Sequence, residues 1–351
     1  MKPIAILGAG NSGLAMAAHL AMEGYPVHLW NRWTDAIGPL FHHPFIKVSG
    51  VINGEARLAL VSSDIREVVE GVSTVLVTTP ANAHRDIAQL LAPYATDDML
   101  IILNPGRTFG ALEFTTELRE NGCSKNPLII ETQTIIYTCR KIDLNQVIIL
   151  TFKHDVLFSA VDHTLNDTVI ARFPECLRPF FSPANSMVET SIGNVGMILH
   201  CAPVLLNSGW IESPYTQFKY YYEGITPSVA RLLEKLDTER LEVARLLGHP
   251  VESTADWLRR SYGVEGESLY ECIQNNPVYR TIDAPTTLQH RYITEDISCG
   301  LVPLETIGRS LGLSMQICGL IIDLANIMLE IDFRENGRKL NTPVLQEELL
   351  R

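Results

Sequence analysis

The sequence predicts an α/β fold in which a doubly wound parallel sheet is followed by a mainly α-helical second domain. Three observations support this prediction. A glycine-rich turn joins an apolar run to an alanine-rich segment near the N-terminus, and short apolar runs then alternate with helical segments to about residue 180. Beyond that point apolar residues recur at helical spacing. We therefore expect a first domain over residues 1–183 and a helical domain over residues 184–351.

The first 30 residues carry the clearest pattern. Residues 4–7 form a short apolar strand, GAGNSG follows at 8–13, and residues 14–23 predict a helix that Gly24 ends. The apolar run at 25–30 then returns to the sheet. A strand, a helix and a second strand in this order predict parallel pairing of the two strands.

The alternation continues along the first domain. Strands are predicted at 75–78, 100–103 and 128–130, and helices at 84–91 and 111–120. Further strand-like runs at 147–152 and 155–159 suggest that the same sheet extends to about residue 180. Alternating strands and helices are typical of a sheet covered by helices on both faces.

The second half of the chain is predicted to be mostly helical. Its last long helix, over about 303–334, is apolar around much of its circumference and is interrupted near Gly312. Such a helix lies inside its domain or in a subunit interface. We therefore expect a homodimer.

Composition excludes several classes of partner. The 351 residues include 28 Lys and Arg against 40 Asp and Glu, and the net charge of −12 disfavours nucleic acid. The 7 cysteines form no CxxC pair, and no HExxH motif is present, so we expect reduced thiols and no metal site. The N-terminus has no secretion signal, and the apolar stretch at 315–331 is too polar to span a bilayer. These features predict a cytoplasmic protein.

The glycine turn predicts a dinucleotide site of the Rossmann type. Gly8 permits the tight turn, Gly10 leaves room for a pyrophosphate, and Gly13 lets helix and strand pack closely. The phosphates then face the helix N-terminus. The predicted cofactor-binding residues are Gly8, Gly10, Asn11, Ser12, Gly13, Asn31, Arg32, Thr34, Thr79 and Pro80.

The end of the second strand bears on cofactor preference. An acidic residue there would bind the ribose hydroxyls and repel a 2′-phosphate, but this chain has Asn31 and Arg32. Arg32 can bind a 2′-phosphate, and Asn31 and Thr34 can donate hydrogen bonds without adding negative charge. NADP(H) is therefore favoured. The alternative is that Arg32 is an ordinary surface arginine in a site that accepts NAD(H).

His200 is the histidine with the most informative surroundings. It ends the apolar segment SIGNVGMILH, where a buried imidazole needs a hydrogen-bond partner. One interpretation is a satisfied core histidine, and the other is a proton donor and acceptor. Glu295 and Asp296 are candidate partners, and Arg291 supplies a cation for a substrate carboxylate.

Several segments, in order along the chain, resemble one family. They are GAGNSG at 8–13, PANAH at 80–84, LNPGRTFGALEF at 103–114, ETQTIIYTCR at 131–140, NVGMILH at 194–200, YYYEGITPSV at 220–229 and RYITEDISCGLVPL at 291–304. Over essentially its whole length, the chain is similar to the opine dehydrogenases.

The resemblance implies a function. Opine dehydrogenases use NAD(P)H to condense the amino group of an L-amino acid with a 2-oxo acid such as pyruvate, through a Schiff base. The catalytic histidine of the family falls on His200, and its aspartate partner falls on Asp296. Arg291, Gln133 and Tyr222 lie in matching segments and are candidates for substrate contacts.

Two other functions stay open at this level. One is a ketopantoate-reductase-like enzyme that reduces a 2-oxo acid to a 2-hydroxy acid, and the other is a dinucleotide-binding protein without turnover. The chain also departs from the family pattern. Asn31 replaces an acid at the end of the second strand, and Phe109 stands where glycine is common.

Overall fold

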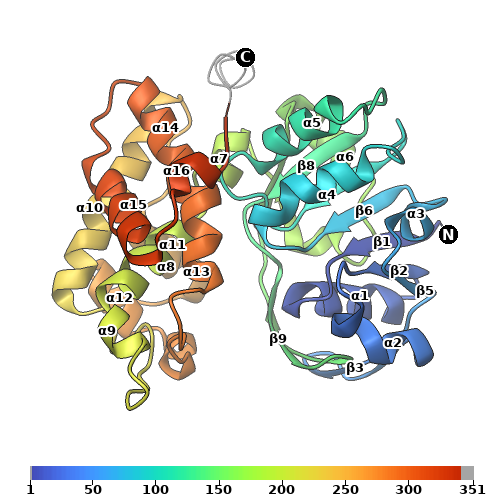
Figure 1. Ribbon diagram of the computed structural model, residues 1–351, viewed down its shortest axis with the longest axis horizontal. Coiled ribbons are helices and arrows are strands. Elements are labelled where there is room, and N and C mark those ends of the chain that lie inside the picture. The colour runs from blue at the N-terminus through green and yellow to red at the C-terminus, as the bar shows by residue number, and fades with distance from the viewer. Residues whose placement is uncertain (1, 341–351) are drawn as a thin grey trace. The chain divides into compact units, whose positions relative to one another are not determined.

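The computed structural model describes residues 2–340 and divides the chain into two compact units, 1–191 and 192–351 (Figure 1). The division lies after Ser191, beyond the boundary at residue 183 expected from the sequence. The reason is helix α7 (Met187–Ser191), which packs against two strands of the first unit, β8 (Leu128–Thr132) and β11 (Val156–Ala160).

The first unit is built on an eight-stranded sheet in the order β12-β11-β8-β7-β6-β1-β2-β5. Its strands pair in parallel except β11, which runs antiparallel to β8. The remaining bounds are β1 (Ile4–Leu7), β2 (Val27–Trp30), β5 (Leu60–Ser62), β6 (Thr74–Val77), β7 (Leu100–Leu103) and β12 (Phe181–Pro183). The predicted parallel pairing of the first two strands is confirmed.

Helices connect these strands, as the alternation predicted. The bounds are α1 (Asn11–Met22), α2 (Gly38–His42), α3 (Ile65–Val69), α4 (His84–Leu91), α5 (Gly110–Glu120) and α6 (Asn166–Ile170). The helices predicted at 84–91 and 111–120 correspond to α4 and α5. The carboxyl ends of β1, β2 and β6 therefore lie side by side, which is where ligands bind in such sheets.

A second sheet of four strands packs on α1 and was not predicted. Its order is β4-β3-β10-β9, with bounds β3 (Phe45–Gly50), β4 (Gly54–Arg57), β9 (Tyr137–Asp143) and β10 (Gln146–Phe152). The assignment of 147–152 to the main sheet was wrong, because β10 pairs with β3 and β9. Contact with this second sheet explains why α1 is buried from Gly13 to Leu20.

The second unit is helical, as predicted. Its bounds are α8 (Gly196–Leu206), α9 (Ser208–Ile211), α10 (Pro227–Leu246), α11 (Thr254–Tyr262), α12 (Leu269–Gln274), α13 (Arg291–Thr294), a π-helical turn (Ile297–Leu301), α14 (Val302–Ser310), α15 (Gln316–Leu329) and α16 (Phe333–Asn336). The single helix expected over 303–334 is thus three helices. Its predicted interruption is confirmed, since Gly312 and Met315 have φ of 84° and 47°.

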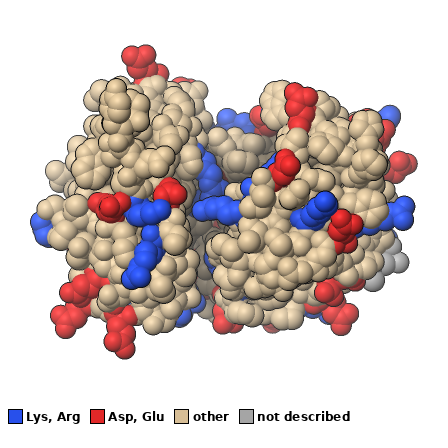
Figure 2. Space-filling model, turned by 90° about the horizontal axis from the view of Figure 1, so that it is seen from below, with Lys and Arg blue, Asp and Glu red and all other residues tan. Residues whose placement is uncertain are grey.

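Residues 2–340 include no helix whose length and hydropathy would let it span a membrane. They also contain no cluster of three His, Cys, Asp or Glu side chains arranged to hold a metal ion. On the face seen in Figure 2, Lys and Arg side chains lie among Asp and Glu side chains.

Candidate active site

The glycine turn has the shape that a bound pyrophosphate requires. Gly8 has φ of +117°, and a Cβ on Gly13 would lie 1.9 Å from the Gly8 carbonyl oxygen, so neither position accepts another residue without strain. A Cβ on Gly10, by contrast, would meet nothing within 4 Å. Gly10 therefore faces open space, and the turn fits a dinucleotide whose pyrophosphate approaches the backbone at this glycine.

The N-terminus of α1 can bind an anion. Gly10 is its N-cap, and no side chain caps the helix. The backbone N–H groups of its first turn are therefore available to phosphate oxygens. Asn11 turns its side chain elsewhere, because its Oδ1 accepts a hydrogen bond of 2.8 Å from the Lys141 backbone N–H. Thr79 follows β6, and its backbone nitrogen lies beside Gly8.

The residues after β2 have partners in the protein. Asn31 Oδ1 accepts a hydrogen bond from the Ala9 N–H at 3.2 Å, and its Nδ2 donates to the Trp33 carbonyl at 3.0 Å. Asn31 thus joins the glycine turn to the segment after β2. Arg32 is exposed and forms an ion pair of 2.9 Å with Asp86 of α4. Thr34 is exposed.

The second unit brings His200 and Asp296 together. His200 lies on α8, and its Nδ1 is 2.8 Å from Oδ2 of Asp296, which follows α13. The Asp296 side chain is fully buried, whereas 14% of the His200 side chain is exposed. Because the carboxylate accepts a hydrogen bond from Nδ1, Nε2 is the nitrogen left to exchange a proton.

Two tyrosines missed in the sequence fix the position of His200. The ring of Tyr292 stacks on the imidazole, with centroids 3.9 Å apart and planes 11° from parallel. The Tyr220 hydroxyl donates a hydrogen bond of 2.7 Å to the His200 carbonyl. Burial raises the pKa of Tyr220 well above its usual value, so Tyr220 stays a neutral donor. Tyr220 lies in the run of three tyrosines at 220–222, which equally fits a core, and Tyr292 stands alone in the segment HRYITED.

The three candidate substrate residues lie in different surroundings. Arg291 is exposed, and its guanidinium carbon lies 6.0 Å from the centroid of the Tyr292 ring. Because Tyr292 stacks on His200, Arg291 lies close to the candidate acid–base pair. Tyr222 donates a hydrogen bond to the Asn276 carbonyl at 3.0 Å. Gln133 is buried in the first unit, where its N–H donates to the Leu157 carbonyl.

The loop after β7 is conformationally unusual. Arg107 and Phe109 have φ of 61° and 56°, in a region that non-glycine residues rarely adopt. The carboxylate of Glu131 lies next to this loop. It accepts hydrogen bonds from the Ala111 N–H at 3.0 Å and from the Thr190 hydroxyl at 2.9 Å. Strain of this kind collects at functional sites.

The chain is similar to known proteins along most of its length. Residues 183–329 match the family described as NAD/NADP octopine/nopaline dehydrogenase, alpha-helical domain, and residues 3–126 match the N-terminus of NAD-dependent glycerol-3-phosphate dehydrogenase. An opine dehydrogenase of Arthrobacter sp. (strain 1C) is 38% identical over 97% of this chain and 94% of its own length. The octopine dehydrogenase of Pecten maximus is 22% identical over 89% of this chain and 86% of its own.

Solved structures confirm the fold class. A structure of octopine dehydrogenase with NADH and agmatine matches with a TM-score of 0.78 at 19% identity, over 96% of this chain and 93% of the other. Yersinopine dehydrogenase with NADP+ bound matches with a TM-score of 0.78 at 14% identity, over 100% and 95%. With 38% identity to a curated opine dehydrogenase along nearly its entire length, the chain belongs to the opine dehydrogenase family of NAD(P)-dependent oxidoreductases acting on CH–NH donors.

Proposed function

We propose that this protein condenses the amino group of an L-amino acid with a 2-oxo acid such as pyruvate and reduces the product with NADPH, using His200 and Asp296 as its acid–base pair. The hydrogen bond between His200 Nδ1 and Asp296 Oδ2 carries the proposal, because it joins a partly exposed imidazole to a buried carboxylate. Octopine dehydrogenase structures with L-arginine and with pyruvate support the substrate class.

The proposed reaction has two stages. The amine attacks the keto carbon, and loss of water from the carbinolamine gives an imine. His200 Nε2 accepts the proton that the attacking amine releases and returns it to the leaving hydroxyl. Asp296 holds the ring in one orientation and stabilises its protonated form. A bound NAD(P)H would supply the hydride that reduces the imine carbon. The imine nitrogen takes up one proton in the same step, from solvent through His200 Nε2.

The preference for NADP(H) is part of the proposal. The Asn31 side chain is neutral and forms hydrogen bonds with backbone groups. Because Asn31 replaces an acidic residue, no carboxylate at the end of β2 repels a 2′-phosphate. Arg32 is a second supporting residue, although its ion pair with Asp86 offsets part of its charge. The Arg32–Asp86 pair is exposed and can open at little cost.

An omission assay tests the proposed reaction. We expect oxidation of NADPH to require both pyruvate and an L-amino acid, with a panel of amino acids naming the preferred amine. His200→Ala should lower turnover roughly 10²–10⁴-fold while NADPH still binds. Oxidation with the keto acid alone would instead identify a 2-oxo acid reductase, and binding without any turnover would identify a non-catalytic protein.

A further inference from the structure

Lys141 lies beside the glycine turn, although 132 residues separate it in sequence from Ala9. It belongs to β9 of the second sheet. Its backbone N–H donates to Asn11 Oδ1 at 2.8 Å, and its Nζ donates to the carbonyls of Ala9 at 3.2 Å and Ala36 at 3.3 Å. Three hydrogen bonds thus hold this strand and its ammonium group against the turn.

Among the described residues 2–340, the Lys141 ammonium group forms no ion pair, and the carboxylate of Asp143, two residues along β9, attracts it only from a greater distance. Both partners of its ammonium group are neutral carbonyls, and an ammonium group has a third N–H to donate. The side chain is half-buried, and burial lowers the pKa of Lys141. A partly desolvated cation is costly unless an anion pairs with it. Arg32 differs, because Asp86 pairs with it.

The positions of the two carbonyl partners indicate which anion would pair with the Lys141 ammonium group. Ala9 lies in the glycine turn, and Ala36 lies in the 3₁₀ helix Thr34–Ile37, which follows β2. In Rossmann domains the adenosine ribose lies between the glycine turn and the residues after the second strand, whereas the pyrophosphate lies at the helix N-terminus. The ammonium group of Lys141 is therefore placed toward the ribose.

We propose that Lys141 is a cofactor-specificity residue that binds the 2′-phosphate of NADP(H). This inference rests on the proposed preference for NADP(H) and names a residue that produces it. Lys141 supplies a positive charge that no direct ion pair neutralises, whereas Arg32 forms an ion pair with Asp86. A lysine ammonium binds phosphate as a point charge, so loss of the charge should weaken only the ligand that carries the extra phosphate.

The experiment measures cofactor binding directly. Dissociation constants for NADPH and NADH are determined by fluorescence titration for the wild type, Lys141→Gln and Lys141→Arg. Glutamine keeps a donor for the two carbonyls but removes the charge. We expect Lys141→Gln to weaken NADPH about 10-fold or more and NADH by less than about 3-fold, with Lys141→Arg close to the wild type. Retained NADH binding shows that the variant is folded.

Two further arms sharpen the test. Adenosine 2′,5′-bisphosphate should lose affinity for Lys141→Gln, whereas AMP should not. Lys47→Met removes an exposed lysine from the same sheet and should leave both cofactors unaffected. Equal losses for NADPH and NADH would place Lys141 at the pyrophosphate, and unchanged constants would give it no role; either result overturns the proposal. Neither substrate is added, so the outcome does not depend on the omission assay.

Discussion

The side chains around His200 show how one residue is held for proton transfer. Asp296 fixes Nδ1 from one edge, Tyr292 covers one face, and Tyr220 holds the backbone carbonyl. Tyr292→Leu removes the stacked ring, and we expect kcat to fall about 10-fold, because a stack is worth about 1 kcal/mol and the imidazole gains rotational freedom. Tyr292→Phe keeps the ring and should retain kcat within about 3-fold.

Steady-state rates and NADPH titrations on the same preparations check this prediction. The NADPH titration shows whether any loss of rate comes from weaker cofactor binding or from the chemical step. Tyr215→Leu serves as the control, because 96% of Tyr215 is exposed. An unchanged kcat in Tyr292→Leu would show that Asp296 alone orients the ring.

Sequence motifs identified residues whose chemistry is local and missed those set by tertiary contacts. The glycine turn shows its roles in its own spacing. His200 and its candidate partners Glu295 and Asp296 stood out in the sequence, and the family resemblance selected Asp296. Sequence motifs could not identify Lys141, because a lysine in a strand has no local pattern that indicates contact with Ala9. Tyr292 is missed for the same reason.

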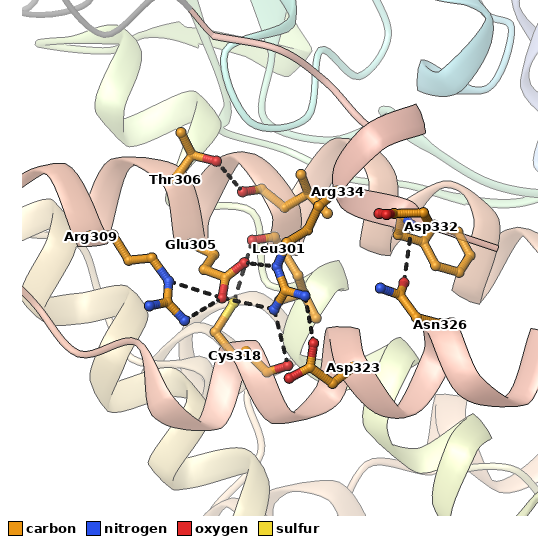
Figure 3. Close-up of polar contacts among 12 residues, drawn as sticks. Leu301, Glu305, Thr306, Arg309, Cys318, Asp323, Asn326, Asp332 and Arg334 are labelled. Atoms are coloured by element: carbon orange, nitrogen blue, oxygen red, sulfur yellow. Dashed lines mark hydrogen bonds and ion pairs between the residues drawn. The ribbon is translucent and has the colours of Figure 1, made fainter. Parts of the chain in front are cut away.

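At the scale of elements, a buried carboxylate joins the last helices of the second unit (Figure 3). Glu305 of α14 accepts hydrogen bonds from Arg309 at 2.8 Å and from Arg334 of α16 at 2.6 Å, and Arg334 also reaches Asp323 of α15. Only 4% of the Glu305 side chain is exposed. Burial alone raises the pKa of Glu305, but the hydrogen bonds from Arg334 and Arg309 outweigh it and leave the pKa below its usual value.

This cluster predicts a pH-dependent contribution to stability. A carboxyl group whose pKa is lowered by folding stabilises the native state above its unfolded pKa, and the effect disappears as the pH falls through the folded value. Glu305→Gln should therefore lower the free energy of unfolding by roughly 2 kcal/mol at pH 7. The difference from the wild type should shrink as the pH falls below the usual Glu value of 4.5.

Urea denaturation at pH 7 and at pH 4 measures the change. Glu335→Gln is a suitable control, since Glu335 pairs with Lys339 on the surface, where 78% of its side chain is exposed. That variant should match the wild type at both pH values. A constant difference for Glu305→Gln at both pH values would show that packing, and not charge, stabilises the cluster.

Among the strands, the apolar sequence pattern predicted those of the main sheet better than those of the second sheet. Strands β1 and β6 are continuous apolar runs, because helices cover both faces of the main sheet, and they were predicted. Strands β3 and β4 interleave exposed residues with their buried ones, so neither contains a continuous apolar run that would mark it as a strand. The periodicity of β10 was detected, but no local signal states which sheet a strand joins.

At the scale of the whole molecule, the homodimer expected from the apolar last helix stays a prediction. The exposed residues of α15 indicate where its interface would lie. Leu320, Leu324 and Ile327 follow one another at helical spacing, and 54% of Leu320 and 76% of Ile327 are exposed. An exposed apolar stripe of this kind is typical of a surface that another protein covers. A second copy of the chain would bury the stripe of each protomer against the other around a two-fold axis.

Sedimentation velocity at micromolar concentration tests the dimer. We expect the wild type to sediment as a dimer and Ile327→Glu to sediment as a folded monomer, because a charge on the stripe cannot be buried without a partner. Leu150→Glu changes an exposed apolar residue of β10 in the other unit and should leave the dimer intact. A monomeric wild type would refute the dimer, whereas dissociation by Leu150→Glu alone would move the interface to the second sheet.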